Sequence, residues 1–222
     1  MNKITTCVFD AYGTLFDVNA ACRELSREVG NKWNELSSLW RLRQIEYTWL
    51  RNSMKDYIDF WKITSDALDY AMETLNIKNI KLRDELLSLY LKLEAYPEVK
   101  SVLENIKRMG LKTAILSNGN KKMLESAVTN ANIKNLIDVI LTVEDCKVYK
   151  PAREVYDLVE SKMGVKKENV LFFSSNAWDM HAASYYGFKT IWVNRFESKL
   201  EKLPGKPISV VNSLEEVSCY LN

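Results

Sequence analysis

A carboxylate stands at Asp10, directly after the apolar run 4–9 and at the head of the turn-forming stretch DAYGT. An Asp that follows a buried strand can attack an electrophilic carbon and form a covalent ester. It can equally cap a turn, and the residue alone does not decide between these roles. Thr14, four residues on, can hold the carboxylate through its hydroxyl or serve as an ordinary turn residue. The stretch therefore contains a candidate nucleophile and a candidate partner for it.

Three further polar side chains adjoin other predicted elements. Ser117 and Asn118 follow an apolar run and offer a hydroxyl, an amide and backbone N–H groups at the start of a predicted helix, where anions bind well. Lys150 stands just before another predicted helix, where its ammonium could neutralise a substrate anion and hold Asp10 in place. Each also has an ordinary explanation, as a helix cap or as a solvated lysine. Together they indicate a site for an anionic substrate.

The segment SSNAWD (174–179) adds a second carboxylate after a third apolar run. Asp179, with Ser174 and Asn176, could hold or activate a water molecule beside Asp10. The alternative is a capped helix start, in which Asn176 or Asp179 is the cap. The order nucleophile, hydroxyl, lysine and second carboxylate is more specific than any of these residues alone.

Strands and helices of about ten residues alternate from residue 96 onward. This alternation predicts βαβ units, and hence an α/β fold with a doubly wound, mainly parallel, Rossmann-like sheet. In such a sheet the site lies beyond the carboxyl ends of the strands, where Asp10, Ser117 and Ser174 fall. The predicted strands are residues 4–9, 111–117, 139–142, 169–174, 189–193 and 208–211, and the predicted helices are 99–109, 121–131, 153–163, 179–186 and 214–221.

A different pattern fills the segment between the first strand and Pro97. Its apolar residues recur at helical spacing, with no Pro, few Gly and no period-two segment, which predicts about four helices. We therefore predict an all-helical cap subdomain at residues 17–95, inserted into a core domain made of residues 1–16 and 96–222.

Composition excludes several classes of protein. The 222 residues carry 31 Lys+Arg and 29 Asp+Glu, a net charge of +2, so nucleic acid is not an expected partner. No run of 18 apolar residues exists to span a membrane, and no secretory signal is evident, so we expect the cytoplasm. The four Cys form no CxxC pair and His181 is the single His. Most zinc enzymes and Ser-His-Asp hydrolases are thereby excluded.

Five motifs together resemble the L-2-haloacid dehalogenases of the haloacid dehalogenase-like superfamily. They span essentially the whole chain, and the cap segment belongs to this branch of the superfamily in particular. Most phosphatases of the superfamily carry a second Asp where this chain has Tyr12, and a second carboxylate in the last motif. The motifs are FDAYGTLFDV (9–18), WRLRQIEYTWLR (40–51), LSNG (116–119), KVYKPAREVY (147–156) and SSNAWD (174–179).

The resemblance implies a hydrolysis without a metal ion or other cofactor. Asp10 would attack C2 of an L-2-haloacid, expel halide with inversion, and form an ester that water hydrolyses to a D-2-hydroxy acid. Arg41, in the cap, would receive the halide, because a guanidinium is a permanent cation. The natural substrate, the preferred halide and the preferred chain length stay open.

The resemblance also implies roles for the other site residues, and a homodimer. Asn118 and Trp178 would complete the halide site, and Ser117 and Lys150 would bind or orient carboxylates. The hydrolytic water would be placed by Ser174, Asn176 and Asp179. Thr14 would orient Asp10 and Tyr156 would support Lys150. An apolar wall around C2 would be formed by Tyr12, Leu42, Ile45 and Phe60.

Two alternatives remain open at the level of sequence. One is a Mg²⁺-dependent small-molecule phosphatase of the same superfamily, against which Tyr12 and the single carboxylate of SSNAWD argue. Mg²⁺ needs oxygen ligands in near-octahedral geometry, and Asp10 and Asp179 alone are a poor set. The other is a non-enzymatic, receiver-like domain, in which the helical insertion with Arg41 would have no purpose.

Overall fold

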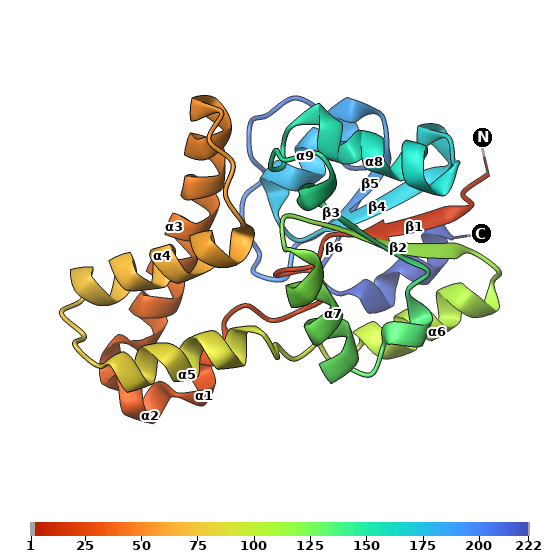
Figure 1. The fold of residues 1–222 in the computed structure, drawn as a ribbon. Helices are drawn as coiled ribbons and strands as arrows, with labels where there is room; N and C mark the ends of the chain where they lie inside the picture. Colours follow the sequence, from red (N-terminus) through yellow and green to blue (C-terminus); the bar gives the residue numbers. More distant parts are fainter. Residues whose placement is uncertain (1–2, 222) are drawn as a thin grey trace.

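Six parallel strands form the centre of the protein. The computed structural model describes residues 3–221, and its sheet has the strand order β3-β2-β1-β4-β5-β6 with every neighbouring pair parallel (Figure 1). The predicted doubly wound core is thereby confirmed, and each strand lies within two residues of its predicted bounds. The strands are β1 (Thr6–Phe9), β2 (Lys112–Ser117), β3 (Val139–Thr142), β4 (Val170–Ser174), β5 (Lys189–Val193) and β6 (Ser209–Val211).

The register of the central strands brings their polar ends together. Phe9 of β1 pairs with Ile115 of β2 on one side and with Phe173 of β4 on the other. Asp10 and Ser174 each follow these paired residues directly, and Ser117 ends β2. The chain runs outward from β1 to β3 and then crosses back to β4, so the strand order reverses beside β1. Ligands of doubly wound sheets bind at such a switch point.

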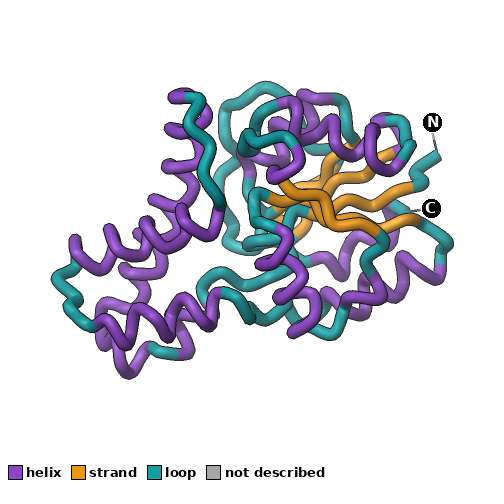
Figure 2. The backbone as a smooth tube through the Cα atoms, viewed as in Figure 1, coloured by secondary structure: helices purple, strands orange, loops and turns teal. Residues whose placement is uncertain are grey.

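Helices cover both faces of the sheet. Helices α6 (Val99–Arg108) and α7 (Lys121–Asn130) lie on one face, and α8 (Arg153–Met163) and α9 (Ala177–Tyr186) lie on the other (Figures 1 and 2). The last predicted helix, 214–221, is instead a 3₁₀ helix over Leu214–Tyr220, opened by a capping box of Ser213 and Glu216. The spacing of apolar residues predicts a helix here but does not distinguish the hydrogen-bond pattern of a 3₁₀ helix from that of an α-helix.

The segment between β1 and α6 forms a separate helical lobe (Figure 1). Asp59 and Asn79 cap two of its helices by accepting from the backbone N–H groups of Trp61 and Leu82, and Trp40 Nε1 donates to Thr64 O at 2.8 Å across the helix pair. Within residues 3–221, no helix has the length and apolar character needed to cross a membrane. The lobe comprises α1 (Ala20–Glu24), α2 (Ser26–Val29), a 3₁₀ turn (Gly30–Lys32), α3 (Trp33–Met54), α4 (Phe60–Thr74) and α5 (Ile80–Tyr90).

Two connecting segments join this lobe to the core side by side. Phe16 and Ala95 form an antiparallel bridge, and Tyr96 N donates to Leu15 O at 3.0 Å. The predicted division at 16/17 and 95/96 falls within this paired segment, although the boundary itself stays a prediction.

Candidate active site

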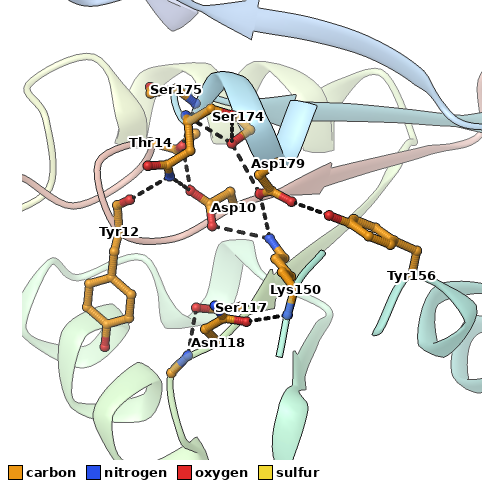
Figure 3. Close-up of polar contacts among 12 residues, drawn as sticks. Asp10, Tyr12, Thr14, Ser117, Asn118, Lys150, Tyr156, Ser174, Ser175 and Asp179 are labelled. Atoms are coloured by element: carbon orange, nitrogen blue, oxygen red, sulfur yellow. Dashed lines mark hydrogen bonds and ion pairs between the residues drawn. The ribbon is translucent and has the colours of Figure 1, made fainter. Parts of the chain in front are cut away.

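Asp10 is a buried carboxylate with a donor on each oxygen. The residue is only 6% exposed and directly follows β1. Oδ2 accepts from Thr14 Oγ1 at 2.9 Å and from Asn176 Nδ2 at 2.8 Å, and Lys150 Nζ lies 3.2 Å from Oδ1 (Figure 3). The turn after β1 and the start of α9 thus hold the same oxygen. Among residues 3–221, Oδ1 accepts from Lys150 alone and so retains a free lone pair for chemistry.

The turn after Asp10 depends on two glycines. Gly13 has φ 91°, in the left-handed region that favours glycine. Gly119 lies under the ring of Tyr12, where an added Cβ would sit 2.8 Å from a ring carbon.

The Tyr12 hydroxyl is buried and has no hydrogen-bond partner among residues 3–221. Burial raises the Tyr12 pKa well above its usual range, so the phenol stays neutral.

Lys150 lies between two carboxylates. Its side chain is 1% exposed, and Nζ lies 2.7 Å from Asp179 Oδ2 and 3.2 Å from Asp10 Oδ1 (Figure 3). One buried ammonium therefore contacts two buried carboxylates and compensates the charge of one of them. Burial and the neighbouring Asp10 raise the pKa of Asp179 to about 6, and the Lys150 ammonium opposes part of that shift. Near neutral pH, Asp179 is therefore close to the range of an efficient general base.

Asp179 is held by two more hydroxyls. Tyr156 donates to Oδ1 at 2.7 Å and Ser174 donates to Oδ2 at 3.2 Å. The resemblance implies that Tyr156 supports Lys150, and the contact between them runs through Asp179. The Tyr156 hydroxyl bonds to Asp179 because α8 places it behind that carboxylate.

Arg41 reaches the site from the cap. Its guanidinium donates to Tyr12 O at 3.1 Å, to Asn176 Oδ1 at 3.2 Å and to Gln44 Oε1 at 2.8 Å. All of these hydrogen bonds within residues 3–221 go to neutral oxygens. The positive charge is therefore available to an anion in the cavity.

These side chains enclose a cavity of about 20 Å³ between cap and core. Ile45 and Phe60, expected in an apolar wall, line it, and so does Trp178, expected in a halide site. Leu42 does not, and placing it in the wall was wrong, because it is 51% exposed. Neighbouring residues of a helix point about 100° apart, so Leu42 faces away when Arg41 faces in. The lining residues are Asp10, Tyr12, Arg41, Ile45, Thr48, Phe60, Ser117, Asn118, Lys150, Asn176 and Trp178.

Comparison with protein families agrees with this geometry. A family model described as a hydrolase, haloacid dehalogenase-like hydrolase, matches residues 4–187. The chain belongs to this family. A relative named (S)-2-haloacid dehalogenase 1, from Pseudomonas sp. (strain CBS-3), is 43% identical over 202 residues, 90% of this chain and 89% of the relative. An (S)-2-haloacid dehalogenase of Pseudomonas fluorescens is 40% identical over 222 residues, 100% of this chain and 98% of the relative.

Solved structures of the haloacid dehalogenase-like family match over the same length. The crystal structure of a dehalogenase with an intermediate complex has a TM-score of 0.97 at 40% identity, and covers 100% of this chain and 98% of that chain. The L-2-haloacid dehalogenase from Xanthobacter autotrophicus, with chloropropionic acid covalently bound, has a TM-score of 0.90 at 33% identity and covers 96% of both chains. The resemblance to L-2-haloacid dehalogenases is therefore confirmed.

This haloacid dehalogenase-like hydrolase also contains site residues that the motifs did not reveal. Gln44 is buried under Arg41, where its Nε2 donates to Thr64 Oγ1 at 2.8 Å and its Oε1 accepts from Tyr90 at 3.1 Å. Gln44 thus orients the guanidinium. Thr48 lines the cavity. Their spacing from Arg41, three and seven residues, marks the same helix face and could have predicted both.

Asn52 fastens the cap to the core beside the lysine. Its amide donates to Tyr149 O at 2.7 Å and accepts from Tyr149 N at 2.8 Å. Tyr149 directly precedes Lys150, whose own backbone N–H donates to Asn118 Oδ1 at 2.9 Å. Cap and core therefore share the segment that positions the ammonium.

The two carboxylates of the site share one lysine. Within residues 3–221, no three side chains of His, Cys, Asp or Glu are grouped so that they could hold a metal ion. The two carboxylates that could begin such a set, Asp10 and Asp179, both contact Lys150. The ammonium thus supplies the positive charge between them.

Proposed function

We propose that this protein is an (S)-2-haloacid dehalogenase that converts L-2-haloalkanoic acids to D-2-hydroxy acids. The observation that carries the proposal is the pairing of Asp10 with the uncompensated guanidinium of Arg41 across one enclosed cavity. A nucleophile and a cation on opposite elements suit a displacement in which negative charge moves to a leaving halide. The apolar side chains Ile45 and Phe60 suit an alkyl carbon between them.

In the first step, Asp10 Oδ1 attacks C2 of the substrate. Oδ1 has the free lone pair, whereas Oδ2 already accepts from Thr14 and Asn176. The bond from Oδ1 to C2 forms as the carbon–halogen bond breaks, its electron pair leaves with the halide, and C2 inverts. Arg41, Asn118 and Trp178 receive the halide, and the unpartnered Tyr12 hydroxyl can donate to it. Ser117 and Lys150 bind the substrate carboxylate.

In the second step, water attacks the carbonyl carbon of the Asp10 ester. Negative charge develops on Oδ2, which lies between Thr14 Oγ1 and Asn176 Nδ2 at 2.9 and 2.8 Å. Such pre-placed donors stabilise the tetrahedral intermediate. A proton of the water passes to Asp179 through the Lys150 ammonium, which contacts both carboxylates. The bond from the carbonyl carbon to Oδ1 then breaks, and Oδ1 leaves as the product hydroxyl after taking a proton back from Asp179 through Lys150. The second proton of the water passes to solvent, and Asp10 keeps the oxygen of the water.

The proposal is tested by halide release from L- and D-2-chloropropionate in EDTA, beside p-nitrophenyl phosphate with Mg²⁺. We expect chloride from the L form alone, unchanged by EDTA. The proposed function is wrong if neither form releases chloride. Cleavage of the phosphate ester that requires Mg²⁺ would then identify a phosphatase instead.

The Arg41→Lys variant is expected to lower kcat by about 10²- to 10³-fold, because lysine keeps the charge but loses the planar fork. The matched control is Arg43→Lys on the same helix, since Arg43 pairs with Glu46 on the surface. Initial rates of chloride release from L-2-chloropropionate measure both variants. Equal rates for the two variants would contradict the proposed role of Arg41 in binding the halide.

Activity is expected to fall as the pH drops below about 6, because Asp179 then becomes protonated. The pKa of Asp179 is 3.8 in its ordinary range and about 6 in the folded protein. The free energy of unfolding should therefore fall as the pH rises from 3.8 to about 6, because the unfolded chain loses this proton first. Hydrolysis of the ester should become the slow step in acid. Rapid quenching at pH 5 and mass spectrometry should therefore find the ester accumulating on Asp10.

The control for this pH profile is Asp179→Asn. That variant should accumulate the ester at pH 7.5 as well, and its residual rate should lose the acidic limb. A limb that persists unchanged in Asp179→Asn would assign the titration to another group.

We further propose a cytoplasmic homodimer that has no nucleic-acid partner. All four cysteines are free thiols, as suits a reducing compartment. The near balance of charges offers no electrostatic footprint for nucleic acid. Helix α3 exposes Leu42, Leu50 and Met54, which a second copy could cover. Light scattering of the purified protein measures its mass directly.

A further inference from the structure

The catalytic cavity is too small for the proposed substrate. Its volume of about 20 Å³ is sufficient for one water molecule, which needs about 10–15 Å³, and not for a halogenated acid. Tyr12, Phe60 and Lys150 lie in the buried interior and close the cavity on their sides. Some part of the wall must therefore move before a substrate can reach Asp10.

A larger groove adjoins the cavity on the outside. It measures about 510 Å³ and lies between the C-terminal half of α3, the outer face of α9 and the loop that follows β5. Ala182 and Tyr185 of α9 line it, with Leu203 of the loop opposite. Tyr185 and Leu203 are both well exposed, so the groove is open to solvent and largely apolar.

Trp178 is the wall between the two spaces. It lines the catalytic cavity and also lines the groove. On the groove side its ring meets Trp49 of α3 edge-on, with centroids 5.4 Å apart and planes at 87°. Trp49 is 38% exposed, so the pair lies at the surface. Trp178 is the residue that the two linings share.

We propose that this groove is the outer chamber of the substrate's access route, and that it binds the alkyl chain of 2-haloalkanoic acids longer than chloropropionate. Trp178 is the movable wall between groove and cavity. The inference rests on the proposed function, because it assigns the chain of that same substrate. Asp10 remains the nucleophile. The groove residues Ala182, Tyr185 and Leu203 affect only the entry and the binding of substrates.

Two physical consequences follow for selectivity. Each methylene that leaves water for an apolar surface is worth about four-fold in binding, so the groove should favour longer chains. Glu201 also lines the groove, and its exposed carboxylate should repel an anionic substrate on its way in. That repulsion acts through solvent and should vanish at high ionic strength.

The first test fills the groove by Ala182→Trp. The matched control, Ser218→Trp, fills a groove of about 600 Å³ between α6 and the C-terminal 3₁₀ helix, which Ser218 lines. We expect Ala182→Trp to lower kcat/KM for L-2-chlorohexanoate by about ten-fold or more, the worth of two buried methylenes. The loss for L-2-chloropropionate should be smaller, and Ser218→Trp should resemble the unaltered protein on both substrates.

The second test leaves the packing intact. Glu201→Lys should raise kcat/KM for both acids about two- to three-fold at 10 mM ionic strength and not at 0.5 M. The proposal is overturned if Ala182→Trp matches Ser218→Trp on both substrates, or if Glu201→Lys has no effect at low salt. Failure of the unaltered protein to release chloride from any 2-haloacid would instead overturn the proposed function.

Discussion

Asp10→Asn is expected to lower kcat/KM for L-2-chloropropionate by at least about 10⁴-fold, as loss of a nucleophile does in other covalent hydrolases. An amide does not form the ester, although it can keep the hydrogen bond that Thr14 donates to Oδ2. The fold should persist, because the side-chain volume hardly changes. Chloride release and thermal unfolding of the same sample measure both effects.

The matched control is Asp145→Asn, at an exposed carboxylate that pairs with Lys162 on the surface. A single turnover of the unaltered protein in ¹⁸O water provides an independent measurement. The label should enter Asp10 before it appears in product, because water attacks the carbonyl carbon of the ester. Label that appears in product alone would mean direct attack of water on C2, and Asp10 would then not be the nucleophile.

Lys150→Met is expected to have the second-largest effect, on both rate and stability. It leaves Asp10 and Asp179 as buried carboxylates without their shared ammonium. Breaking a buried ion pair from one side destabilises a protein by about 3–5 kcal/mol. Loss of the charge that opposes the raised pKa of Asp179 should also leave that acid protonated at higher pH. We expect kcat to fall about 10³-fold.

Denaturant unfolding and chloride release separate these two effects. Lys162→Met, which breaks an exposed pair with Asp145, should change neither. The double variant Lys150→Met/Asp179→Asn should regain stability, since one buried charge is gone, but not activity. Wild-type stability in Lys150→Met would show that the site tolerates both carboxylates unpaired, and would contradict this account of the ammonium.

Much of the core site could be predicted from local pattern. Parallel strands end at the same edge of a sheet, so identifying the apolar runs before Asp10, Ser117 and Ser174 was enough to bring these residues together. Helices with clear stops, such as Arg153–Met163, begin and end where the pattern indicates. These features depend on residues near one another in the chain, so local sequence patterns are sufficient to predict them.

Contacts between cap and core were harder to predict. Helical spacing places Arg41, Ile45 and Thr48 on one face of α3, but it does not say which face meets the sheet. Leu42 was assigned to the wall by analogy and proved to be exposed. Spacing also places Gln44 on the Arg41 face, but its partners Thr64 and Tyr90 belong to α4 and α5. Their packing depends on the rotation and crossing of whole helices.

The class of fold, the order of the candidate catalytic residues and the family could all be inferred from the amino-acid sequence. This was possible because strand ends, turns and helix periods are local, and because the motifs occur in sequence order. Three further facts required the folded molecule: Lys150 joins two carboxylates, Tyr156 donates to Asp179, and Trp178 lines both a small cavity and a groove. Those facts depend on distances between side chains far apart in the chain, which arise when cap, sheet and loops pack together.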